Sequence, residues 1–133
     1  MRIDFGSWSL ERHLQWEADQ DGDYLTLTRT DDGGAFQLSS GRKSHGSVTD
    51  EDLDWCIQRY MTGLKGEWSI PAPVVLGEFS GKHTAATIDG TFWSWWILGC
   101  GPVLLRASYN GPSTFVDAEL PHVESMLGTL VSA

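Results

Sequence analysis

The segment from residue 91 to residue 109 constrains the fold of this chain more than any other. Two runs rich in aromatic and branched residues, Thr91–Leu98 and Val103–Tyr109, flank the turn Gly99-Cys100-Gly101-Pro102. Such runs predict a hairpin of two antiparallel strands around a glycine-rich turn, with Pro102 tolerated at the start of the second strand. The first strand is apolar on both of its faces, so we expect it to lie centrally in a sheet that is covered on both sides.

The first third of the chain predicts further short strands separated by acidic turns. The candidate strands are Trp8–Leu10, Leu14–Ala18, Tyr24–Thr30 and Ala35–Ser40, and Asp21-Gly22 and Asp31-Asp32-Gly33-Gly34 are turn signals. An antiparallel meander that pairs 24–30 with 35–40 would place the two acidic turns at opposite ends of one strand. Further along, Val74–Phe79 and His83–Asp89 predict two strands joined by Ser80-Gly81-Lys82.

Two segments predict helices. Thr49 is a good N-cap with Asp52 three residues later, as in a capping box. An apolar stripe at helical spacing follows, and Gly63 is a plausible end; the stripe is Leu53, Cys56, Ile57, Tyr60 and Leu64. The second helix is expected from about 117 to 131, with Pro121 in its first turn. Its stripe is Leu120, Val123, Leu127 and Leu130.

These elements predict one α+β domain over residues 1–133, an antiparallel sheet of about six to seven strands with two helices packed on it.

The net charge and the distribution of apolar residues argue against several classes of function. With 18 acidic and nine basic residues, the net charge is −9, which argues against nucleic-acid binding because phosphate neutralisation needs clustered Lys and Arg. The absence of a long apolar run argues against a membrane role. The residues from Met1 to Gly6 lack the apolar core of a secretory signal, so we expect a cytoplasmic protein.

No set of residues predicts catalysis, a metal or a cofactor. The four histidines are scattered and have no ligand at the spacing that zinc sites use. The acidic run at 19–23 resembles the start of a calcium loop, but its glycine is at the wrong position and Thr30 stands where such a loop has Glu. Cys56 lies on an apolar helix stripe, and Cys100 has no basic neighbour in sequence to activate it. We therefore expect no enzyme activity and no cofactor.

The acidic residues and the tryptophans supply the candidate binding residues. Acidic side chains can attract and orient a basic protein partner, and tryptophan is enriched at the energetic centres of interfaces. The alternatives are that the acids serve solubility and the helix dipole, and that the seven tryptophans form the core. The candidates are Asp19, Asp21, Asp23, Asp31 and Asp32 on the two turns, Asp50, Glu51 and Asp54 at the first helix, and Trp93 and Trp95 as anchors.

Several segments between residues 30 and 130 carry a resemblance in their order along the chain. They are Gly34-Ala35-Phe36-Gln37-Leu38-Ser39, Lys43, Val48-Thr49-Asp50-Glu51-Asp52-Leu53, Trp93-Ser94-Trp95-Trp96, Leu104-Leu105-Arg106-Ala107-Ser108-Tyr109-Asn110 and the closing helix to Leu130. In this order the chain resembles a widespread group of small, mostly uncharacterised bacterial proteins. It departs from the group at Ser108, where threonine is usual, and at Gly111, where cysteine often follows the asparagine.

The resemblance implies an α/β sandwich akin to the PsbP/Mog1 type, and some similar proteins are linked to toxin systems as immunity proteins. It defines no catalytic residues. The leading hypothesis is therefore a cytoplasmic immunity-type protein that occludes the active site of a secreted toxin domain, such as a basic nuclease. The alternatives are a protein-interaction module of the same fold outside toxin systems, and a small ligand-binding domain or enzyme whose site is not visible in the sequence.

Overall fold

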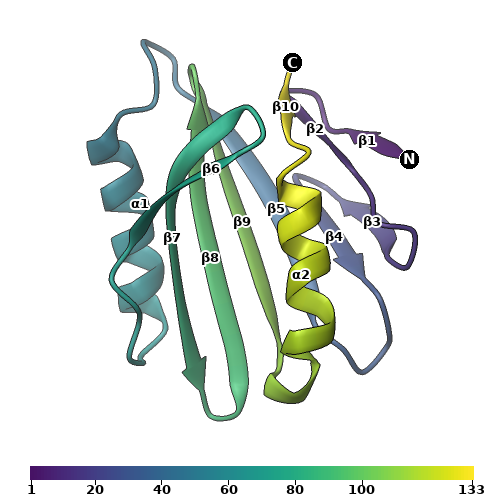
Figure 1. Cartoon of the computed structure of the whole chain (residues 1–133). Helices are drawn as coiled ribbons and strands as arrows, with labels where there is room; N and C mark the ends of the chain where they lie inside the picture. Colours follow the sequence, from purple (N-terminus) through teal and green to yellow (C-terminus); the bar gives the residue numbers. More distant parts are fainter.

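A computed structural model describes residues 1–133 and shows ten strands in two antiparallel sheets with two helices (Figure 1). The larger sheet has seven strands and the smaller has three. In spatial order the larger sheet contains β3 (Glu17–Asp21), β4 (Tyr24–Thr28), β5 (Ala35–Arg42), β9 (Val103–Pro112), β8 (Thr91–Cys100), β7 (Phe79–Ile88) and β6 (Ala72–Leu76). The smaller contains β1 (Arg2–Asp4), β2 (Trp8–Glu11) and β10 (Val131–Ser132). The predicted α+β class and the strand number of the main sheet are confirmed.

The predicted hairpin at residues 91–109 is the centre of the larger sheet. Strand β9 is the middle strand, and β8 pairs with it along its whole length, from Thr91 opposite Pro112 to Cys100 opposite Val103. Side chains of β8 alternate between two separate cores, because Trp96 and Leu98 lie in the larger core and Ile97 lies in the smaller one. The strand is therefore covered on both sides, as its apolar sequence predicts.

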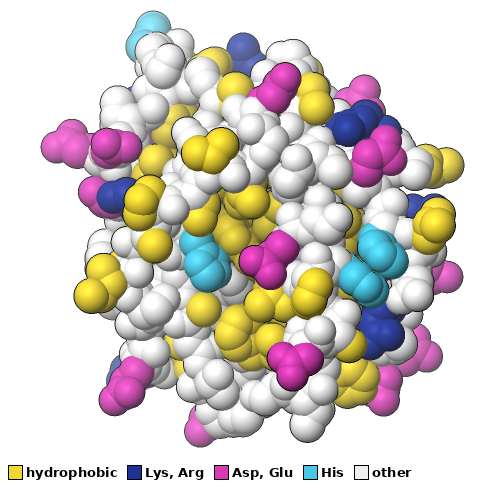
Figure 2. Space-filling model, viewed as in Figure 1, with side chains coloured by type: hydrophobic (Ala, Val, Ile, Leu, Met, Phe, Trp, Pro, Cys, Tyr) yellow, Lys and Arg dark blue, Asp and Glu magenta, His cyan; other side chains and the backbone are white.

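The two helices pack on opposite faces of the larger sheet. Helix α1 (Asp50–Gly63) lies against β7 and β8, where Leu53, Cys56 and Ile57 form the smaller core with Ile97. Helix α2 (Val116–Leu127) crosses the other face beside β9 and follows a short 3-10 turn (Figure 1). The larger core lies on this second face, and hydrophobic side chains gather there beside α2, with acidic groups scattered around them (Figure 2). Neither helix has the length and hydropathy needed to cross a membrane.

The start of α1 follows the predicted capping box. The Thr49 side chain accepts a hydrogen bond from the Asp52 N–H, and the Asp52 carboxylate accepts one from the Thr49 N–H. Lys43 donates to the same carboxylate at 2.7 Å. This hydrogen bond from Lys43, followed by that from the Thr49 backbone, lowers the pKa of Asp52 to about 2. The helix ends at Gly63, as expected.

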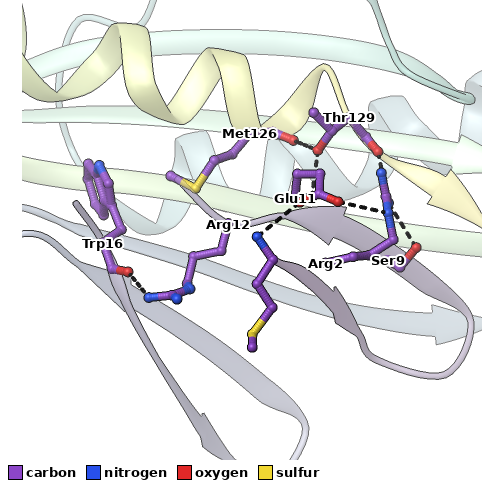
Figure 3. A network of polar contacts seen from close by, with 8 residues as sticks. Arg2, Ser9, Glu11, Arg12, Trp16, Met126 and Thr129 are labelled. Carbon is purple, nitrogen blue, oxygen red and sulfur yellow. Dashed lines mark hydrogen bonds and ion pairs between the residues drawn. The ribbon is translucent and has the colours of Figure 1, made fainter. Parts of the chain in front are cut away.

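The second helix departs from its predicted bounds. It ends at Leu127 rather than near 131, because Gly128 and Thr129 turn the chain so that β10 can pair with β2. Pro121 lies well inside the helix and not in its first turn, because the helix begins at Val116. The smaller sheet thereby joins both ends of the chain: Arg2 contacts Ser9, Glu11 and the Thr129 carbonyl (Figure 3).

Two predicted boundaries in the strands are wrong for identifiable reasons. Residues 80–82 are not a loop but part of β7, and the turn lies at Gly77 and Glu78, where Gly77 has a φ of +63°. Gly81 is needed for close packing instead, since a Cβ there would lie 2.0 Å from the Ile97 carbonyl oxygen. The strand predicted over residues 14–18 is instead β3, which begins at Glu17. Leu14 lies outside the strand and is 88% exposed.

Candidate functional site

On one face of the larger sheet, α1 covers β7 and part of β8, and the face from β3 to β9 is open, with Trp93 and Trp95 of β8 at its border with the helix. The pairing register identifies a row of residues that share it across five strands: Asp19, Thr26, Gln37, Ser108 and Trp95. Parallel rows on either side contain Glu17, Thr28, Asn110 and Trp93, and Asp21, Tyr24 and Arg106. We call these twelve residues the open sheet face.

The open sheet face has an acidic edge and an aromatic side. Asp19 and Asp21 on the edge strand β3 are exposed. At the other side, the rings of Trp93 and Trp95 run nearly parallel, with centroids 6.4 Å apart and planes at 12°. Tyr60 from α1 stacks on Trp95 at 4.0 Å. Both tryptophans are half-buried, so part of each is available to a partner.

Two hollows lie along the boundary between α1 and this face. The first has a volume of about 200 Å³, and the second of about 440 Å³. Tyr60 and Arg106 line both hollows, so we treat them as one feature, the Arg106 groove. The other lining residues are Tyr24, Gln37, Leu38, Ser39, Trp95 and Ser108 in the first and Trp55, Cys56 and Arg59 in the second.

The Arg106 groove contains two arginines and no carboxylate. No ion pair joins Arg59 or Arg106 to an acidic residue. The Nε of Arg106 and the Nε1 of Trp95 are buried and have no hydrogen-bond partner. Buried donors without partners are uncommon in folded proteins, so these two nitrogens are an unusual feature of the groove.

Burial dominates the titration of two groups in the groove, the Cys56 thiol and the Tyr60 hydroxyl. It raises the pKa of the Cys56 thiol, and the positive charges of Arg106 and Arg59 offset this only in part. It likewise raises the pKa of the Tyr60 hydroxyl, next to which Arg106 acts in the opposite sense. Both groups are therefore neutral near neutral pH, and Cys56 lacks the thiolate character of a nucleophile.

The structure brings together only some of the acidic residues that the sequence singled out. Asp19 and Asp21 share the open sheet face with Trp93 and Trp95. Asp23 lies in the turn beside them, whereas Asp31 and Asp32 follow the opposite end of β4, as the predicted pairing required. Asp50 and Glu51 are exposed in the first turn of α1, and Asp54 is paired with Lys82.

Sequence reasoning missed Tyr24, Tyr60, Trp55 and Arg106. Trp55 is 64% exposed and lies off the apolar stripe of α1, with the Arg59 guanidinium 4.7 Å from its ring centroid. Its position outside the apolar stripe of the predicted helix indicates an exposed tryptophan, so the sequence alone could have identified it. The only signal for Arg106 in the sequence is that it is the one charged residue of β9.

A second polar cluster lies on the face that carries α2. Glu119 is fully buried, and its carboxylate accepts hydrogen bonds from the Tyr109 hydroxyl at 2.7 Å and the Gly34 N–H at 2.8 Å. The Arg29 Nε lies 3.2 Å from its other oxygen. This cluster is closed to ligands and joins α2 to the sheet. Nowhere do three His, Cys, Asp or Glu side chains converge as metal ligands would.

Comparison with known proteins shows the fold alone. No family model matches the sequence, and no curated protein matches it. A crystal structure from Bacteroides thetaiotaomicron VPI-5482 superposes with a TM-score of 0.63 at 18% sequence identity. The match covers 98% of this chain and 47% of that one, so this chain spans about half the length of the structure it resembles.

Proposed function

We propose that this chain is an immunity-type binding protein, which neutralises a partner protein by covering the partner's functional surface with its open sheet face. The observation that carries the proposal is the joint placement of Asp19, Asp21, Trp93 and Trp95 on one face of the sheet, with the two half-buried tryptophans beside α1 and the two acids on the edge strand. Half-buried tryptophans surrounded by polar groups are the usual centre of a protein interface, and charges at its edge set the association rate.

A basic partner fits this face best. The acidic edge lies on a strand with every residue exposed, and the chain as a whole carries a net charge of −9. A nuclease domain of a secreted toxin has a positive surface for phosphate, which an acidic face can occupy. The resemblance to a bacterial group with immunity-type members supports the same class of partner. In this proposal the protein acts in the cytoplasm and contacts neither nucleic acid nor membrane.

The experiment pairs the chain with the product of the neighbouring gene, which this proposal expects to be a nuclease-type toxin domain. Co-expression should rescue growth of cells that produce the toxin domain, and the two proteins should co-purify. Trp93→Ala should abolish rescue, because truncation of an interface anchor costs about 2 kcal/mol or more. The double variant D19N/D21N should slow association and weaken its dependence on salt.

Asp31 and Asp32 supply the matched control for charge. D31N/D32N removes the same charge from the far end of β4, which the proposed interface does not reach. This variant should leave the association rate close to that of the parent chain. Equal slowing by both double variants would indicate an effect of net charge only, and full rescue by Trp93→Ala would refute this interface.

The Arg106 groove favours a second candidate function, the binding of a small ligand. Ligand sites combine apolar walls with a few placed polar groups, and the groove has aromatic walls and two arginines. The positive charge of this groove distinguishes it from the acidic edge of the open sheet face.

A further inference from the structure

The Arg106 groove is lined by positively charged side chains, although the chain as a whole has a net negative charge. Eighteen acidic residues are distributed over 133 positions, yet none lines the groove, and two of the nine basic residues do. Four other basic side chains have acidic partners, Arg2 with Glu11, Arg29 with Glu119, Lys43 with Asp52 and Lys82 with Asp54, whereas Arg106 is half-buried without one. A local excess of positive charge in an acidic protein indicates a site that attracts an anion.

Arg106 is placed to bind that anion. It lies on β9, the middle strand, between Ser39 of β5 and Ile97 of β8. Its side chain is half-buried and no carboxylate neutralises it. Its Nε is buried without an acceptor, and so is the Nε1 donor of Trp95. Because a half-buried charge without a counter-charge is costly, an anion bound to the Arg106 guanidinium where it lines the groove would stabilise this side chain.

The walls of the groove select the shape of the ligand. Tyr24, which is 54% exposed, stands on one side, and the stacked rings of Tyr60 and Trp95 stand on the other. Polar side chains of Gln37, Ser39 and Ser108 lie among these rings. Aromatic walls favour a flat ligand, since ring faces and edges pack well against planar groups.

We propose that the Arg106 groove is a binding site for a small organic acid whose carboxylate is attached to a planar, unsaturated group. The carboxylate binds the Arg106 guanidinium, and the planar group lies against Tyr24, Tyr60 and Trp95. The planar fork of an arginine matches a carboxylate in geometry and charge. A tetrahedral phosphate fits less well than a carboxylate, because a carboxylate can lie in the plane of the group that carries it and the aromatic walls favour a flat ligand.

Benzoate is the probe, and the indole N–H of Trp95 is the reporter. In ¹H–¹⁵N spectra of the ¹⁵N-labelled chain, benzoate should shift this resonance saturably, because the ligand binds against the Trp95 ring. Benzamide has the same shape without the charge and should bind at least tenfold more weakly. Acetate has the charge without the ring and should also bind more weakly, as should phenyl phosphate.

Variants assign the binding to the groove. R106Q should remove saturable binding of benzoate, and R42Q should retain it, because Arg42 is an exposed arginine of β5 with no ion pair. Backbone spectra of each variant report whether it folds. If R106Q does not fold, Tyr24→Ala replaces it as the test: it should weaken benzoate binding several-fold and leave acetate binding unchanged.

Three results would overturn the proposal. They are the absence of saturable benzoate binding to the parent chain, binding of benzamide or phenyl phosphate as tight as that of benzoate, and unchanged binding by folded R106Q. The assay contains no partner protein, so its outcome does not depend on the proposed immunity role. Failure of growth rescue would leave the ligand site standing, and failure of benzoate binding would leave the interface standing.

Discussion

Tyr60 of α1 lies almost flat on Trp95 of β8, with ring centroids 4.0 Å apart and planes at 17°. The smaller core under α1 contains only four buried residues, so this stack is a substantial part of what holds the helix on the sheet. The same pair forms one wall of the Arg106 groove. The attachment of α1 and the shape of the groove therefore depend on one aromatic contact.

A double-mutant cycle on this pair measures its contribution to stability. Tyr60→Ala and Trp95→Ala should each lower the free energy of unfolding, and the coupling between them should be about 0.5–1.5 kcal/mol, as for stacked aromatic pairs. Urea unfolding of the parent, both single variants and the double variant supplies the four values. Trp55 is the control partner: it is exposed on α1 and its ring does not stack on Trp95, so Trp55→Ala should add independently to Trp95→Ala.

Glu119 supplies a second prediction about stability. Glu119→Ala removes the acceptor for Tyr109 and Gly34 and leaves the Arg29 charge without its partner, so it should cost about 3 kcal/mol or more. Glu119→Gln keeps an acceptor oxygen but turns a donor toward Arg29, so we expect a smaller loss. Chemical denaturation of both variants tests the order. A loss as large for Gln as for Ala would assign the effect to charge alone.

The local signals in the sequence predicted the elements well. Thr49 and Asp52 define the start of α1 because a capping box is made by residues three apart. The hairpin of β8 and β9 was predictable because strand-forming runs and a glycine-rich turn follow one another directly. Gly81 misled the prediction, because it permits close approach of Ile97 from a neighbouring strand, which no local pattern reveals.

The candidate site could be predicted only in part, because it depends on register across five strands. Trp93, Trp95, Asp19 and Asp21 were recognised as residues of the right type, but their shared face follows from pairings between strands far apart in the sequence. Arg106 of β9 lies near Tyr60 only because α1 packs on β7 and β8, and β8 is the neighbour of β9. A single sequence contains no periodicity that reports this contact.

Leu127 tests the packing of α2. Its side chain is 0% exposed in the larger core, so Leu127→Ala should cost about 2–5 kcal/mol through lost burial and the cavity that remains. Leu14→Ala removes the same atoms from a side chain that is 88% exposed and should change stability by less than about 0.5 kcal/mol. Thermal or urea unfolding measures both. Similar losses for the two variants would contradict the packing of this helix.

Tyr109 predicts a loss of stability in alkali. Its burial, together with the hydrogen bond to the Glu119 carboxylate, raises the pKa of its hydroxyl far above the ordinary value near 10. The folded chain therefore keeps a proton that the unfolded chain releases. The resulting stability is fully present below about pH 9 and falls by ~1.4 kcal/mol per pH unit once the pH exceeds about 10.

Tyr109→Phe separates this titration from other effects of alkali. The variant loses the hydrogen bond to Glu119 and should be less stable than the parent at neutral pH, by about 1–3 kcal/mol. Its stability should then decline less steeply between about pH 9 and 11, because one titrating group is gone. Tyr60→Phe should also make the decline less steep, because burial raises the pKa of the Tyr60 hydroxyl as well. Urea midpoints across this range measure the slopes, and equal slopes for Tyr109→Phe and the parent would show that Tyr109 does not cause the alkaline loss.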